Sequence, residues 1–412
     1  MSSPTVAWLR TLPLPLKIAG CVWLLMVLIV SIRVLVTKNT TQTVYPIYFQ
    51  AAERFAQQQP LYATDTGLDV YRYPPSVAML FVPFTWVPIK LGAVVWRLLG
   101  LGLYALAIQR SLRVFAPQAT IRQYSIAWLV AGIGLLPAFN NGQLNLFIAA
   151  AALLATVAMH KRRWLEAGLW CAMLALCKLY PLALGLVFCV MAPLRFRVSL
   201  VLLLVAGATL PWCCRDSEYA WSSTREYVAE LSRDDRSSAE TLPERTPRDW
   251  TVIPRAWFGY AVPRPMSLAV SALAGLGIAV LALILKNPHT GALPNLLGLV
   301  LVWMTVFGPA TEHNTYVLLT PACALLLAMD ARQSRLIRWC ARLGTLLLFL
   351  SLLRAVAGSQ LPFDTLECQP FGGFCLAIAL LKSAIPIVPI DRAQARLRMQ
   401  RSSEPAALQP VR

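Results

Sequence analysis

Charged residues, and acidic residues above all, are scarce in this chain of 412 residues. Only 14% of the residues are charged, whereas an ordinary soluble domain carries roughly 25%. The hydrophobic residues make up 58% of the chain and occur in runs of about 15 to 20 residues separated by short basic connectors. This pattern excludes a typical soluble enzyme and predicts an all-α, polytopic integral membrane protein.

Residues that bind metals are also few. The chain has three histidines and contains neither a CxxC nor an HExxH motif, so we expect no metal ion and no cofactor. Its ten cysteines do not follow the spacing of a disulfide framework. A disulfide is left open only for the cysteines near the predicted outer face, which are Cys213, Cys214, Cys368 and Cys375.

Twelve apolar segments are predicted to be transmembrane helices, and the short ones require tilted or broken helices. They cover residues 18–36, 91–109, 123–138, 143–159, 164–179, 181–194, 198–212, 265–285, 292–308, 315–329, 341–357 and 371–389. The proline-rich residues 74–88 are also apolar, but we expect them to lie at the outer interface as a helix that does not cross. Residues 1–390 thus form a single transmembrane domain.

Lysine and arginine concentrate in the connectors that face the cytoplasm when the N-terminus lies inside. Twelve crossings then place both termini in the cytoplasm, with residues 391–412 as a basic tail. The long connectors 37–90 and 213–264 lie outside the plasma membrane, where we expect them to cover a site. The net charge of +18 therefore sets the topology and favours membrane lipids as partners, and nucleic acid is not an expected partner.

The first outer loop carries an amphipathic segment and a cation close to lipid. Residues 44–62 place an apolar set at helical spacing, which predicts an amphipathic helix lying on the membrane. The set is Tyr48, Ala51, Ala52 and Phe55. Further on, Arg72 and Tyr73 precede two prolines where the chain re-enters lipid, so Arg72 could bind a phosphate at headgroup depth.

The polar stretch NNGQLN, residues 140–145, interrupts apolar sequence at the outer end of a helix pair. We expect Gly142 to break the helix and leave free backbone amides beside Asn141 and Gln143. Such amides suit sugar hydroxyls or a phosphate. A capped helix hairpin fits the same residues equally well, because asparagine and glycine are ordinary turn residues.

A second polar stretch, CKLYP at residues 177–181, lies at the tip of the next hairpin. Lys178, close to Tyr180, could bind a lipid phosphate there. The alternative is a lysine whose side chain merely reaches water.

The third polar stretch is GPATEHNTY, residues 308–316, also predicted outside. Glu312 and His313 lie between two apolar segments, so desolvation could raise the carboxylate pKa into the range of a proton-transfer group. A capped helix start with an exposed Glu312 is the alternative.

Four loose motifs occur together in a consistent order: PLY…YRYPP in the first outer loop, NGQLN, a K-x-YP turn, and PATEH…Y before a late helix. Together, from about residue 44 to about residue 327, they resemble glycosyltransferase family 87. This family comprises polyprenol-phosphate-mannose-dependent mannosyltransferases with the multi-spanning GT-C fold.

The resemblance implies an inverting sugar transfer on the outer face of the membrane. A hexose, mannose in this family, leaves a polyprenyl-phosphate carrier and joins a lipid or glycan acceptor. A carboxylate in the first outer loop deprotonates the acceptor hydroxyl, and cations hold the departing phosphate. On this basis the substrate-binding candidates are Arg72, Tyr73, Asn141, Gln143, Lys178, Tyr180 and His313.

The chain departs from the family pattern at the catalytic acid. The family's aspartate is expected shortly before the amphipathic helix, but residues 41–45 contain no acid. The candidates for a displaced base are Asp69, Glu53 and Glu312. Two other interpretations stay open: a non-catalytic membrane protein that retains the GT-C architecture, and a transporter or flippase of lipid-linked sugar.

Overall fold

The computed structural model describes residues 13–37, 43–63, 68–233, 248–285, 292–308, 311–329, 333–357 and 368–385. Within these ranges every regular element is a helix and there is no β-strand, which confirms the predicted all-α class. The predicted basic tail, residues 391–412, lies outside the described residues.

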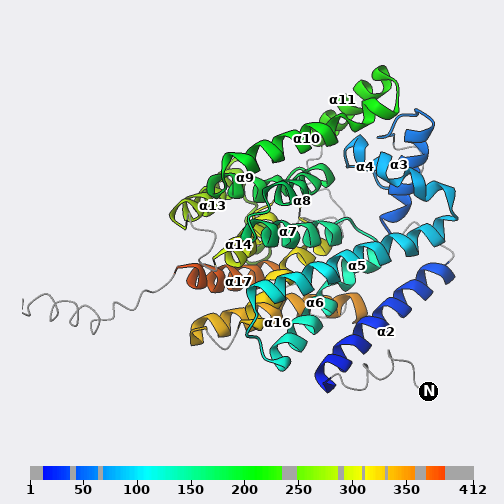
Figure 1. Cartoon of the computed structure of the whole chain (residues 1–412). Helices are drawn as coiled ribbons and strands as arrows, with labels where there is room; N and C mark the ends of the chain where they lie inside the picture. The colour runs from blue at the N-terminus through cyan, green and yellow to red at the C-terminus, as the bar shows by residue number, and fades with distance from the viewer. Residues whose placement is uncertain are drawn as a thin grey trace, which may run out of the picture.

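The described part of the chain runs through a series of α-helices and the short 3-10 helices η1 and η3 (Figure 1). In chain order they are α2 (Leu14–Val36), α3 (Tyr45–Ala56), α4 (Pro75–Phe81), η1 (Val82–Trp86), α5 (Ile89–Phe115), α6 (Ile121–Asn141), α7 (Asn145–His160), α8 (Trp164–Cys177), α9 (Leu182–Met191), α10 (Leu194–Cys214), α11 (Ser217–Arg233), α12 (Val252–Phe258), α13 (Arg264–Ile284), α14 (Leu293–Val306), η3 (His313–Leu319), α15 (Thr320–Ala328), α16 (Arg335–Ala357) and α17 (Cys368–Ala384). Each predicted apolar segment overlaps a helix, and residues 315–329 are divided between η3 and α15.

Four of the described helices, α2, α5, α10 and α13, are long and apolar enough to cross a membrane. Only 6% of the most apolar part of α13 is buried in the protein, compared with 50% for α5. An exposed apolar surface of this kind suits contact with lipid, so α13 has a peripheral place and α5 an inner one. Other apolar helices, such as α7 and α14, are shorter, and twelve crossings stay a prediction.

Helix α7 lies at the centre of the bundle, between α5 and α8 (Figure 1). It also contacts α14 and η3. Nearly all of its residues are buried, and many are alanines, whose small side chains let neighbouring helices approach closely. The start of α7 is therefore fixed in position by packing against several neighbouring elements.

The predicted amphipathic helix is present as α3, and Pro46 in its first turn suits a helix start. Its apolar face packs against α4, η1 and α5, and Tyr48 and Ala52 are fully buried by these elements. The expectation that this face lies on the membrane is therefore wrong, because protein covers it. Residues 74–88 fold into the short helices α4 and η1 beside α3.

The two predicted outer loops contact each other. Arg215 Nε donates a hydrogen bond to the Phe55 carbonyl at 2.9 Å, and the Tyr219 hydroxyl donates to the Gln59 carbonyl at 3.0 Å. The residues before and within α11 thus lie against the end of α3. Of the four cysteines predicted near the outer face, Cys213, Cys214 and Cys375 are free thiols, so no disulfide joins these three.

The turn between α6 and α7 depends on Gly142 and on a buried arginine of α5. Gly142 ends α6 with φ +71°, a left-handed conformation that glycine adopts at little cost. Arg97 donates from Nε to the Phe139 carbonyl and from Nη2 to the Asn140 carbonyl, both at 3.0 Å. A Cβ on Gly142 would lie 3.0 Å from the guanidinium carbon of Arg97, so any larger residue would require the arginine to shift slightly.

We predict that Gly142→Ala lowers the stability of the protein. The left-handed conformation costs a residue with a Cβ about 1–2 kcal/mol, and the guanidinium must also shift. The measurement is the apparent melting temperature of the purified protein in detergent, followed by tryptophan fluorescence.

Gly102→Ala is the matched control for this prediction. Gly102 lies within α5, is exposed, and would have no atom within 4 Å of an added Cβ. Alanine is the better helix former, so the melting temperature should be unchanged or higher. Equal losses in both variants would contradict the role assigned to Gly142.

Candidate functional site

The α6–α7 turn forms one wall of the candidate site, and its backbone amides are engaged within the protein. The Gly142 and Gln143 N–H groups donate to carbonyls of the last turn of α6, and the Leu144 N–H donates to the Tyr48 hydroxyl at 3.4 Å. The expected free amides at Gly142 are therefore absent at these three positions. These three amides are therefore not available to a ligand.

A chain of hydrogen bonds crosses the turn and joins a carboxylate to a lysine. Gln143 Nε2 donates to Glu312 Oε2 at 3.4 Å, and Gln143 Oε1 accepts from Asn145 Nδ2 at 2.8 Å. Asn145 Oδ1 in turn accepts from Lys178 Nζ at 3.2 Å. Three separate polar stretches of the sequence thus meet at one place, with Glu312 at one end of the chain and Lys178 at the other.

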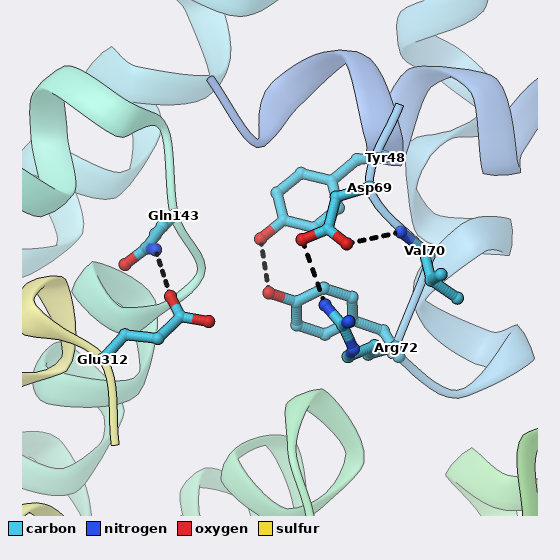
Figure 2. Close-up of polar contacts among 7 residues, drawn as sticks. Tyr48, Asp69, Val70, Arg72, Gln143 and Glu312 are labelled. Atoms are coloured by element: carbon cyan, nitrogen blue, oxygen red, sulfur yellow. Dashed lines mark hydrogen bonds and ion pairs between the residues drawn. The ribbon is translucent and has the colours of Figure 1, made fainter. Parts of the chain in front are cut away.

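Lys178 lies near two tyrosine rings, one from the first outer loop and one two residues further along its own turn. The ammonium of Lys178 lies 5.6 Å from the ring centre of Tyr73 and 5.8 Å from that of Tyr180, within the range of cation–π attraction. The Tyr48 hydroxyl donates to the Tyr73 hydroxyl at 2.9 Å (Figure 2). Burial raises the pKa of Tyr48, and so does Tyr73, so the Tyr48 hydroxyl keeps its proton at neutral pH.

The hydroxyl of Tyr180 is buried beside this group and has no hydrogen-bond partner among the described residues. Burial raises the pKa of Tyr180; the Lys178 charge opposes this rise, and Tyr73 and Glu312 add to it. The hydroxyl therefore remains a neutral donor. Buried polar groups are usually paired, so this hydroxyl is available to donate to a ligand oxygen.

Asp69 and Arg72 form an ion pair on the loop that leads into α4. Arg72 Nη1 lies 3.1 Å from Asp69 Oδ2, and the side chains are 25% and 37% exposed, respectively. The other oxygen of Asp69 accepts from the Val70 N–H at 2.9 Å. Figure 2 draws this pair near Tyr48, with Gln143 and Glu312 on the other side of the view. Asp69 is thus a carboxylate already balanced by a neighbouring cation.

The remaining predicted site residues lie around or away from this group. Glu53 is exposed on α3, on the face away from its buried residues. The carbonyl and side-chain oxygens of Asn141 both accept from the Val44 N–H at 3.2 Å, so Asn141 attaches the start of α3 to the turn. His313 lines a cavity between α6, η3 and α16, and its carbonyl accepts from Gln369.

The structure adds two residues that the sequence prediction did not include, Asn145 and Tyr48. Asn145 is the last residue of NNGQLN and the first residue of the buried helix α7. A polar residue at that position in the sequence could have identified it as a site candidate. Tyr48 was assigned only to an apolar face, although a buried tyrosine hydroxyl usually has a polar partner.

The assembled groups can perform two tasks. Glu312 can accept a proton, and Lys178 with the neutral tyrosines can bind an anion such as phosphate. Among the residues that the structure describes, no three histidine, cysteine, aspartate or glutamate side chains are grouped to hold a metal ion.

Comparison with protein families identifies the family of this chain. The model of glycosyltransferase family 87 matches residues 71–310, more than half of the chain, and includes Tyr73, the α6–α7 turn and Lys178. Glu312 lies two residues beyond the end of the matched region. No curated protein matches the chain significantly. With its long apolar helices the protein is a membrane glycosyltransferase, and the chain belongs to glycosyltransferase family 87.

Proposed function

We propose that this protein moves a hexose, mannose by analogy with its family, from a polyprenyl-phosphate carrier to a hydroxyl of a lipid or glycan on the outer face of the membrane. The observation that carries the proposal is the hydrogen-bonded chain Glu312–Gln143–Asn145–Lys178 beside the unpaired Tyr180 hydroxyl. It supplies the two groups that such a reaction needs, one base and a binding site for phosphate.

Glu312 is the best candidate for the base. Its half-buried carboxylate receives a hydrogen bond from Gln143 and lies at the end of the polar chain. Asp69 is already engaged in an ion pair with Arg72, with 3.1 Å between Oδ2 and Nη1. Glu53 is exposed on α3, where water surrounds it. Of the three candidates, Glu312 is the one that is half-buried and is linked by hydrogen bonds, through Gln143 and Asn145, to Lys178.

Lys178 is the proposed partner of the donor phosphate. Its ammonium lies against two tyrosine rings, and the neutral hydroxyl of Tyr180 can add a hydrogen bond to a phosphate oxygen. Arg72, the residue before Tyr73, is ion-paired with Asp69 and could supply a second cation by exchanging that partner for the phosphate. Charge-assisted hydrogen bonds of this kind are about twice as strong as neutral ones.

The reaction is a single displacement at the anomeric carbon. The acceptor oxygen forms a bond to that carbon as its proton passes to Glu312. The bond between the anomeric carbon and the phosphate oxygen breaks, and the electron pair leaves with the polyprenyl phosphate. The phosphate gains one negative charge, which Lys178 stabilises, so no acid is needed for the leaving group. Attack from the face opposite the phosphate inverts the configuration.

The first test is transfer of radiolabelled mannose from polyprenyl-phosphate-mannose to a membrane lipid extract by the purified protein in detergent. A labelled product supports the proposed reaction. If the carrier binds saturably but no product forms, even with other hexoses, the protein is a lipid-binding member of the family without transferase activity.

We predict that Glu312→Gln lowers the transfer rate about 10²–10⁴-fold, the usual contribution of a general base. Donor binding should change little, because the amide retains the shape of the side chain. The measurement is the initial rate of labelled product together with the dissociation constant of the donor.

Glu53→Gln is the control, since Glu53 is exposed on α3, and it should leave the rate unchanged. Full activity of Glu312→Gln would exclude Glu312 as the base. A loss confined to Asp69→Asn would assign the base to the first outer loop instead.

We also predict that Lys178→Gln weakens donor binding about 10- to 100-fold. A hydrogen bond to a charged group contributes about 1.5–3 kcal/mol, and each 1.4 kcal/mol is a factor of ten in affinity. The measurement is equilibrium binding of polyprenyl-phosphate-mannose.

Lys382→Gln provides the matched control, because Lys382 is an exposed lysine at the end of α17. It removes the same charge far along the chain from the α6–α7 turn and should leave the affinity unchanged. An unaltered affinity in Lys178→Gln would contradict the assigned phosphate contact.

A further inference from the structure

A cavity lies behind the α6–α7 turn, where the end of α2 meets the starts of α3 and α5; its lining is largely apolar but includes several cationic side chains. It encloses about 460 Å³ of empty space, part of it open to solvent, and is referred to below as the α2–α5 cavity. Three cations line it, Arg33, Lys90 and Arg97. None of its described lining residues is acidic, and the intervening sequence KNTTQ, residues 38–42, contains no acid either.

The three cations contact only neutral groups within the described part of the chain. Arg33 Nη1 donates to Asn140 Oδ1 at 2.7 Å, and Lys90 Nζ donates to the Leu35 carbonyl at 2.9 Å. Like charges gathered in one cavity repel each other, and the repulsion is largest where water is displaced. A bound anion would remove this cost.

Arg97 is the most enclosed of the three, with only 3% of its surface exposed. It donates to the carbonyls of Ala93, Phe139 and Asn140. A guanidinium has five N–H donors, so these three bonds leave two donors for another acceptor. Arginine presents such donors in a planar arrangement that matches a phosphate group.

The hydroxyl of Tyr45 is an independent sign of a ligand. Tyr45 is 1% exposed and lines the cavity, yet its hydroxyl has no hydrogen-bond partner among the described residues. A Cβ at position 92 would overlap this hydroxyl, so Gly92 leaves the room that it occupies. Burial raises the pKa of Tyr45 to about 12, against the effect of Arg97, so the hydroxyl is a neutral donor.

The α2–α5 cavity is separate from the candidate transfer site. Arg97 and Asn140 line the cavity, whereas Gln143 and Asn145 extend to Glu312 and Lys178. The phosphate proposed to bind at Lys178 therefore does not lie in the α2–α5 cavity.

The geometry points to a binding site for the phosphate group of an anionic membrane phospholipid in the α2–α5 cavity, held by Arg33, Lys90, Arg97 and the Tyr45 hydroxyl. Arg33 is in the last turn of α2 and Lys90 in the first turn of α5, so the cations lie at helix ends, where lipid headgroups are found. The bound lipid would join α2, α3 and α5 next to the turn that carries the transfer site.

A purely structural explanation accounts for only part of these observations. Lys90 bonds to a carbonyl at the end of α2, and cations near a helix C-terminus are favourable. That explanation gives no partner to the buried Tyr45 hydroxyl and no use for the remaining donors of Arg97. A phosphate satisfies both, because its oxygens are acceptors only.

The test is equilibrium binding of fluorescent phosphatidylglycerol to the full-length protein in detergent. We expect Tyr45→Phe and Lys90→Gln each to weaken binding about tenfold, which corresponds to about 1.4 kcal/mol. Tyr45→Phe removes a hydroxyl that bonds to no described group, so the fold should be retained. Phosphatidylcholine also has a phosphate, but its choline cation cancels the negative charge, so it should bind more weakly than phosphatidylglycerol.

Arg110→Gln is the control, since Arg110 is an exposed arginine of α5 outside the cavity, and its binding should equal that of the unaltered protein. Equal affinity in all variants, or an equal loss in Arg110→Gln, would overturn the site. Displacement of the lipid by inorganic phosphate at equal molar affinity would overturn the lipid assignment and identify free phosphate as the ligand.

Lys178→Gln separates this proposal from the proposed function. It should leave phosphatidylglycerol binding unchanged, and a loss as large as that of Tyr45→Phe would mean that the lipid occupies the transfer site. The assay contains no sugar donor, so its result does not depend on whether sugar transfer is observed.

Discussion

The contact between Arg97 and the α6–α7 turn is the constraint on which the rest of the site depends. The Arg97 guanidinium donates to the Phe139 and Asn140 carbonyls near the end of α6. The neighbouring Trp96 Nε1 donates to the Gly142 carbonyl at 2.9 Å. These bonds from α5 fix the point at which α6 ends and α7 begins. Gln143 and Asn145 then point to Glu312 and Lys178, while Arg97 itself lines the cavity behind the turn.

The sequence predicts local features of this protein well and long-range contacts poorly. Apolar runs indicated the helices, and residue spacing indicated the buried face of α3, because both depend on the hydrophobicity of near neighbours. The bond between Gln143 and Glu312 joins residues 169 positions apart. No local pattern indicates such a pairing, nor that the amides at Gly142 would be satisfied by α6 and Tyr48.

The proposed base, Glu312, comes from a different part of the chain than the aspartate that the family pattern leads one to expect in the first outer loop. The start of α3, where that acid is expected, is attached to the turn through the bonds between Val44 and Asn141. Glu312 approaches the same turn from a loop late in the chain, through Gln143. A base supplied by Glu312 would therefore reach the turn from a different part of the chain, so the absence of an acid from residues 41–45 does not by itself exclude catalysis.

The cost of the buried polar groups argues against a purely architectural role. A buried polar group without a partner costs about 1–3 kcal/mol, and the hydroxyls of Tyr45 and Tyr180 are two such groups in the described structure. Replacing buried ionic groups by well-packed apolar ones is often neutral or stabilising, so a scaffold would gain by losing them. Each unpaired hydroxyl instead lies beside a lysine or an arginine, where one phosphate oxygen could satisfy the hydroxyl and the cation together. A phosphate from the sugar-carrier lipid at Tyr180 and a phosphate from a phospholipid at Tyr45 would thus each supply the missing hydrogen-bond partner, on the two sides of the α6–α7 turn.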